Sequence, residues 1–182
     1  LWGCNEESGS ADMKYYLAHG GEIPVMGFTP DGEYPVINGE KGIINVTYEK
    51  KLDRMGDLQL ISLHGGTAPN VVPASACAKL ACSQELAKRL ATLHEPNLRF
   101  TATEYGVFVE AEGVSAHGST PELGENAIGR LLLALDTLPL EGQTREVIHF
   151  LAETLGMETD GRSAGIAPVH YTHLTQPTTS TL

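Results

Sequence analysis

The sequence has 182 residues, of which 41% are hydrophobic and 19% charged, enough for one sizeable core or for parts of two domains. Twelve Lys and Arg against 23 Asp and Glu give a formal net charge of −11, which argues against nucleic acid and anionic membranes as partners, because phosphates attract clustered cations. The three cysteines show no Cys-x-x-Cys spacing, and no apolar run reaches the roughly 20 residues of a membrane span, so we expect a cytoplasmic protein.

Residues 1–42 are predicted to be part of an α/β domain. Residues 1–4 are typical of the end of a buried strand, so we expect the natural N-terminus to lie upstream. Ser10 can cap a helix over residues 11–19, and the apolar run 23–28 favours a second buried strand. Two strands joined by a helix indicate a parallel sheet.

The acidic clusters of this region fall at the C-terminal ends of its predicted strands. Glu6 and Glu7 follow the first strand, and Asp31 follows the second in a Pro-Asp-Gly turn. Because ligands of parallel sheets gather at that edge, we expect the three carboxylates to converge on one cavity.

Residues 43–140 are predicted to form a separate small α+β domain. Short runs in which every second residue is apolar alternate with helical periods, and the connections are short. This order predicts a four-stranded antiparallel sheet with two helices on one face. The strand patterns lie at 44–48, 58–63, 71–82, 98–103 and 106–113, and the helical ones run from the cap Ser83 to Leu93 and from Pro121 to Leu138.

The C-terminal part divides near residue 167. A third helix near 144–155, followed by a return segment, makes up residues 141–167. Residues 168–182 have no apolar period and are predicted to be a disordered or non-native tail. His170 and His173 within it are therefore not assigned as metal ligands.

The pair Glu6 and Glu7 stands in a loop before a helix. Adjacent residues of an extended loop point in different directions, so one carboxylate can bind a cation while the other acts as general base on a metal-bound water. A purely structural role also stays open for each candidate residue. Two glutamates complement a helix dipole, Asp31 fits an ordinary β-turn, and His117 fits a loop histidine bonded to local backbone.

Four motifs, in this order and spacing, resemble the PepV-type dipeptidases. These belong to the co-catalytic zinc metallopeptidases, the family that includes carnosinases, aminoacylases and succinyl-diaminopimelate desuccinylase. The motifs are Asn-Glu-Glu-Ser-Gly-Ser at 5–10, Gly-Phe-Thr-Pro-Asp-Gly-Glu-Tyr-Pro at 27–35, Asn-Gly-Glu-Lys-Gly at 38–42, and Gly-Val-Ser-Ala-His-Gly-Ser-Thr-Pro-Glu at 113–122. The last is similar to a loop of that family's lid domain, so the resemblance covers roughly residues 1–140.

The resemblance implies a role for each matching residue. Glu6 would be the general base that takes a proton from a water bridging two zinc ions, with Glu7 a ligand of one zinc and Asp31 a ligand of the other. His117, in the lid, would polarise the scissile carbonyl and stabilise the oxyanion. Asn70 matches a lid asparagine that helps bind the small peptide substrate.

The sequence departs from the family by lacking the His-x-Asp motif, the bridging Asp, the late His and the C-terminal substrate-binding segment. We expect those groups before Leu1 and past Leu182, so the chain is interpreted as a middle fragment. Two carboxylates fall short of the three or more protein ligands of a zinc site. We therefore expect the chain alone neither to bind zinc tightly nor to hydrolyse dipeptides.

Two other functions stay open beside the zinc-dependent dipeptidase. An N-acyl amino acid deacylase or desuccinylase of the same family shares the Glu-Glu and Asp arrangement. Alternatively, residues 43–140 could be a non-catalytic interaction module that self-associates through an exposed sheet edge.

Overall fold

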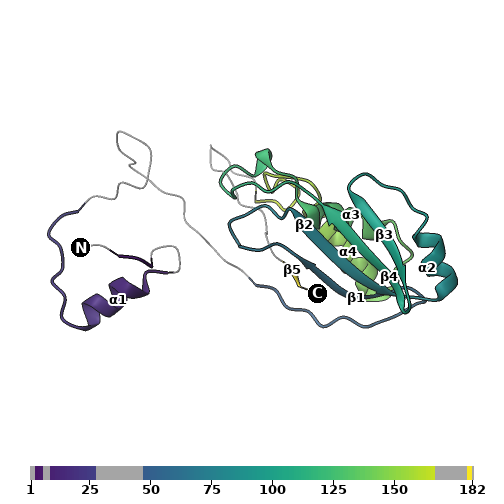
Figure 1. Ribbon diagram of the computed structural model, residues 1–182, viewed down its shortest axis with the longest axis horizontal. Helices are drawn as coiled ribbons and strands as arrows, with labels where there is room; N and C mark the ends of the chain where they lie inside the picture. Colours follow the sequence, from purple (N-terminus) through teal and green to yellow (C-terminus); the bar gives the residue numbers. More distant parts are fainter. Residues whose placement is uncertain (1–2, 6–8, 28–46, 167–179, 182) are drawn as a thin grey trace. The chain divides into compact units, whose positions relative to one another are not determined.

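A computed structural model describes residues 3–5, 9–27, 47–166 and 180–181 (Figure 1). The chain divides into two compact units, Leu1–Ile44 and Asn45–Leu182. Within the described residues, no helix combines the length and the apolar character needed to cross a membrane.

The first unit contains one described helix, α1 (Ala11–Ala18), close to the predicted range. Its first turn differs from the prediction because Ser10 has φ 53°, in the left-handed region, and its side chain makes no capping hydrogen bond. A serine that caps a helix normally has extended backbone angles. The helix ends at His19, and Gly20 follows with φ 81°.

The buried strand predicted at 23–28 is wrong for its described residues, 23–27, which form no strand. Ile23 and Met26 are exposed, and Val25 is 99% exposed. Residues 3–4 of the predicted first strand are likewise not a strand. A buried parallel strand needs neighbouring strands for its backbone hydrogen bonds, and the described residues of this unit supply none.

The second unit is built on an antiparallel sheet of four main strands, as predicted. The strands are β1 (Gln59–Gly65), β2 (Ser75–Ala81), β3 (Leu98–Thr103) and β4 (Gly106–Glu112), and the two-residue β5 (Ser180–Thr181) pairs with the end of β1. The order across the sheet is β3-β4-β2-β1-β5. Of the predicted tail, 168–182, only these two paired residues lie in the described part.

Three α-helices accompany this sheet, α2 (Gln84–Leu90), α3 (Ala127–Asp136) and α4 (Gly142–Thr154). Ser83 caps α2 as predicted, because its side chain accepts a hydrogen bond from the N–H of Leu86. Asn126 caps α3 by accepting from the N–H groups of Ile128 and Gly129. Figure 1 shows α3 and α4 together behind the sheet, and α2 beside β3.

The core lies between one face of the sheet and these helices. Ala76, Ala78 and Leu80 of β2 and Val107 and Val109 of β4 are buried at every second position. The helices contribute mainly leucine and isoleucine to the same cluster, at Leu90, Ile128, Leu131, Leu132, Leu135 and Ile148. The residues between the buried ones lie on the opposite, open face of the sheet.

Two predicted elements of the second unit need correction. The strand pattern at 44–48 gives no strand in its described residues, and Tyr48 is 91% exposed. The helix predicted at 121–138 is interrupted: Pro121–Leu123 form a short 3-10 turn, and α3 begins only at Ala127. The interruption arises because Glu125 pairs with Val114 through two backbone hydrogen bonds of 2.9 Å, which a continuous helix could not make.

Candidate functional site

The predicted catalytic Glu6 and the predicted metal ligands Glu7 and Asp31 lie outside the described residues. Their expected convergence is therefore a prediction still. The structure does describe the residues on both sides of Glu6 and Glu7.

Asn5 joins the two sides of the Glu6–Glu7 segment. Its carbonyl oxygen accepts the N–H of Ser10 at 2.8 Å, and its side-chain oxygen Oδ1 accepts the N–H of Ala11, also at 2.8 Å. Asn5 thus provides the helix cap that the sequence pattern assigned to Ser10. The spacing of Asn5 from the helix, six residues, hides this cap from a search for a residue directly before the first turn.

Asp12, in the first turn of α1, binds the backbone of the two residues Cys4 and Asn5. Its Oδ2 accepts the backbone N–H of Cys4 at 2.6 Å and that of Asn5 at 3.1 Å. The hydrogen bond from Cys4 lowers the pKa of the Asp12 carboxyl, helped by the N–H of Met13, because bonds to the charged form favour it. A side chain at Gly3 would begin 2.7 Å from Oδ2, so this position leaves room for the carboxylate.

The predicted lid residues Asn70 and His117 are brought together. Residues 70–72 of the β1–β2 connection run antiparallel to residues 116–118: the N–H of Gly118 donates to the carbonyl of Asn70 at 2.7 Å, and the N–H of Val72 donates to the carbonyl of Ala116 at 2.8 Å. Both named side chains are exposed. Two motifs 47 positions apart in sequence therefore present polar side chains from adjacent backbones.

Further backbone bonds fix the loop at its base. The N–H of Gly113 donates to the carbonyl of Ala74, and the N–H of Ala127 donates to that of Pro73, each at 2.9 Å. With the Val114 and Glu125 pair, these bonds attach both ends of the loop to the start of β2. Glu125 also forms an ion pair with Arg130 of α3.

The imidazole of His117 is bonded to Ser119. Its Nδ1 lies 2.7 Å from the hydroxyl Oγ of Ser119 and accepts the backbone N–H of Ser119 at 3.2 Å. Such local bonding is what an ordinary loop histidine would make, and it occupies only one ring nitrogen. Within the described residues, Nε2 has no hydrogen-bond partner.

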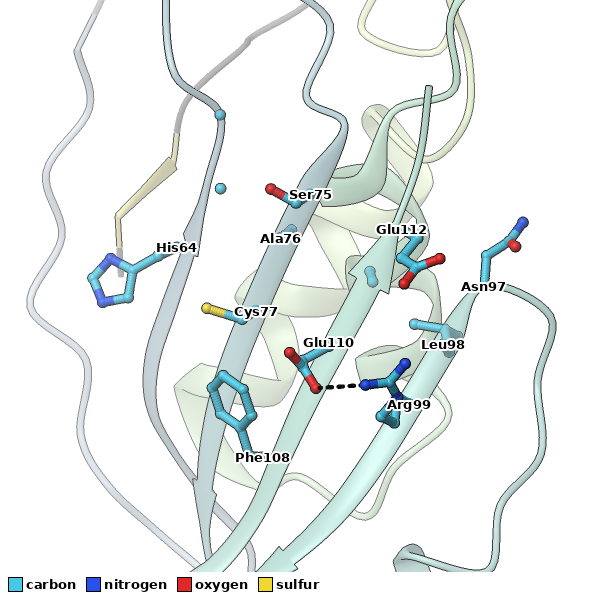
Figure 2. A pocket seen from close by; sticks show the side chains of 13 residues that line it. His64, Ser75, Ala76, Cys77, Asn97, Leu98, Arg99, Phe108, Glu110 and Glu112 are labelled. Carbon is cyan, nitrogen blue, oxygen red and sulfur yellow. Dashed lines mark ion pairs between the residues drawn. The ribbon is translucent and has the colours of Figure 1, made fainter. Parts of the chain in front are cut away.

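The open face of the sheet carries a second polar group that sequence analysis missed. His64, Cys77, Glu110 and Arg99 are register partners across β1, β2, β4 and β3, and they line one hollow (Figure 2). Arg99 and Glu110 point toward one another, with 3.9 Å between Nη1 and Oε2, in a solvent-exposed ion pair. The alternation of each strand was visible in the sequence, but the register that aligns these four residues was not.

No cluster of three His, Cys, Asp or Glu side chains suited to a metal ion occurs in the described ranges 3–5, 9–27, 47–166 and 180–181. Cys4, Cys77 and Cys82 are all free. Burial raises the pKa of the Cys82 thiol.

The chain is similar to dipeptidases over most of its length. It is 34% identical over 170 residues to the Beta-Ala-Xaa dipeptidase of Lactobacillus delbrueckii subsp. lactis, a match that covers 90% of this chain and 36% of that protein. It is 29% identical over 177 residues to a presumptive dipeptidase of Staphylococcus haemolyticus, and 30% identical over 175 residues to one of Staphylococcus saprophyticus, each match covering 91% of this chain and 35% of the relative. No family model matches the chain.

The chain thus spans about a third of the length of the curated relatives it matches. The similarity supports a relationship to dipeptidases.

Proposed function

We propose that this chain is part of a zinc-dependent dipeptidase of the PepV type, an enzyme of the cytoplasm that hydrolyses the amide bond of a dipeptide. The observation that supports the proposal is the backbone pairing of residues 70–72 with 116–118, because it joins the two segments that contain Asn70 and His117. The similarity to dipeptidases along nine tenths of the chain supports it. The three free cysteines fit a reducing compartment.

The proposed division of labour follows the residue types. Glu6 acts as general base toward the attacking water, and Glu7 and Asp31 are carboxylate ligands of the metal centre. Zinc accepts carboxylate oxygen, but a site normally takes three or four protein ligands, so further ligands would come from other parts of a longer protein. When bound, the metal supplies a water whose pKa is lowered to about 7.

Asn5 and Asp12 support the general base and its neighbour. Three backbone N–H groups donate hydrogen bonds to the oxygens of these two side chains and tie the residues before Glu6 to the first turn of α1. A general base is effective only when it is held within hydrogen-bonding reach of the proton it removes. The bonds restrict the backbone on both sides of the glutamates, which favours such placement.

His117 serves the other side of the reaction, the substrate carbonyl. As water attacks, negative charge develops on the carbonyl oxygen, and a fixed N–H donor stabilises it. The exposed His117 has one ring nitrogen available for this purpose, and the exposed Asn70, on the paired segment, would offer an amide to the substrate.

The experiment is a hydrolysis assay of a longer protein that contains this chain, with zinc, on dipeptides and on N-acetyl and N-succinyl amino acids. We expect turnover of dipeptides. His117→Ala should lower kcat about 100- to 1000-fold, the usual effect of losing one oxyanion donor. His94→Ala, at another exposed histidine, is the matched control and should leave kcat unchanged.

Two outcomes would contradict the proposal. Turnover of the acyl amino acids in place of dipeptides would assign the deacylase function. Dipeptide turnover by the purified 182-residue chain, or tight zinc binding to it in calorimetry, would refute the dependence on further ligands.

A further inference from the structure

The orientation of the two hydrogen bonds at His117 Nδ1 determines where the ring carries its proton. A backbone N–H can only donate, so the bond from Ser119 N–H at 3.2 Å requires Nδ1 to be an acceptor. The hydroxyl of Ser119, 2.7 Å from the same nitrogen, then donates its proton as well. A neutral imidazole has one donor and one acceptor nitrogen. With Nδ1 accepting, the proton resides on Nε2.

The opposite tautomer is disfavoured by the same geometry. A proton on Nδ1 would point at the N–H of Ser119 and leave two donors facing each other. Only the hydroxyl could rotate to accept. The backbone N–H of Ser119 could not turn away from Nδ1, because the backbone on both sides of it is fixed by hydrogen bonds. Gly118 N–H donates to the carbonyl of Asn70, and Thr120 N–H donates to the carbonyl of His117 at 2.9 Å.

The geometry points to Ser119 as a positioning residue that keeps His117 in the Nε2–H tautomer, with that N–H presented outward as the donor to a substrate oxygen. The catalytic part of this inference rests on the proposed dipeptidase function, whereas the tautomer does not. Ser119 touches only the far side of the ring, so it acts through His117. A histidine with its proton on Nδ1 would turn a lone pair toward the developing oxyanion and could not stabilise it.

The tautomer can be measured on the 182-residue chain by NMR. Correlation of ring nitrogens with ring protons at about pH 8, where an ordinary imidazole is neutral, distinguishes a protonated from an unprotonated ring nitrogen. His117→Gln identifies the signals of His117 among the seven histidines. We expect Nε2 protonated and Nδ1 unprotonated in the unsubstituted chain.

Two substitutions test the role of the hydroxyl. Ser119→Ala removes one of the two donors and should shift the tautomer ratio roughly two- to tenfold toward Nδ1–H, the effect of one hydrogen bond. Ser119→Thr keeps a hydroxyl and should restore the original ratio. Thermal unfolding of all variants should be alike, because Ser119 is exposed. A predominant Nδ1–H form in the unsubstituted chain, or an unchanged ratio in Ser119→Ala, would overturn the inference.

The catalytic part is tested in the longer, active protein. Ser119→Ala should reduce kcat roughly two- to tenfold with little change in KM, because the donor acts on the transition state, and Ser119→Thr should recover it. Full kcat in Ser119→Ala would overturn the catalytic role. If the unsubstituted protein shows no turnover, the proposed function fails and the catalytic role with it, whereas the NMR result still decides the tautomer.

Discussion

Asp12 shows how a single half-buried carboxylate can organise a loop. It accepts two consecutive backbone N–H groups, from Cys4 and Asn5, and thereby fixes the segment that leads to Glu6. Its pKa is lowered chiefly by the bond from Cys4, so the carboxylate form persists to a pH below 3.8. Nothing in residue type distinguishes Asp12 from the other acidic residues, which is why its role required a structure.

The sign of the Asp12 effect gives a pH prediction. A depressed pKa means that the contribution of Asp12 to order in this loop is present above its ordinary pKa and is lost as pH falls through the lower, folded value. The amide proton shifts of Cys4 and Asn5 should therefore move together in one transition below pH 3.8. Asp12→Asn keeps an acceptor but cannot titrate, so an NMR titration of this variant should lack the transition. If the transition remained, another group would be responsible.

The helix α3 closely approaches the turn that follows α4. A Cβ at Gly129 would lie 1.7 Å from the carbonyl oxygen of Gly156, far inside van der Waals contact. Gly156 itself has φ 40°, in the left-handed region, which glycine adopts without steric cost. The sequence predicts a helix near 144–155 but gives no sign that Gly129 lies against the residue that follows it.

Gly129→Ala should therefore lower the stability of the protein, although alanine has the higher helix propensity. In an exposed helix this change stabilises by about 1 kcal/mol. Here we expect a loss of about 1–3 kcal/mol, because the added methyl forces the α3–α4 contact apart. Urea unfolding followed by circular dichroism measures the difference. Gly27→Ala, where a Cβ meets nothing within 4 Å, should change stability by about 0.5 kcal/mol or less. Equal effects at the two positions would contradict the packing argument.

For the molecule as a whole, sequence was informative where local pattern and burial coincide. The alternation of Ala76, Ala78 and Leu80 predicts β2 because one sheet face is buried and the other is open. The apolar pattern does not predict a strand correctly at Val25 and Tyr48, because these residues have no partner strand among the described residues. In β1 a bulge between Leu60 and Ser62 shifts the inward set, so that Leu63 and not Ser62 is buried.

The candidate site was predictable to a smaller extent. The resemblance suggested Asn70 and His117, and the structure pairs the backbone segments that contain them, whereas their roles stay a prediction. Ser119 escaped notice because a serine two residues beyond a histidine is common, and only the bond directions reveal its effect. Self-association through a sheet edge stays a prediction.

The burial of a side chain in the core determines how much stability its truncation should cost. Leu131 and Leu133 stand two positions apart on α3, the first fully buried and the second 42% exposed. Leu131→Ala should cost about 2–5 kcal/mol through lost burial and a residual cavity. Leu133→Ala should cost about 0.5 kcal/mol or less. Urea midpoints with equal slopes would measure both, and similar losses at the two sites would mean that the sheet and helices do not pack as described.

The backbone hydrogen bonds between residues 113–127 and residues 70–74 restrict how His117 can move. A loop held by backbone bonds at its base and its middle cannot swing by itself. The imidazole can therefore move on its own only by side-chain rotation, which is far faster than the displacement of a folded body.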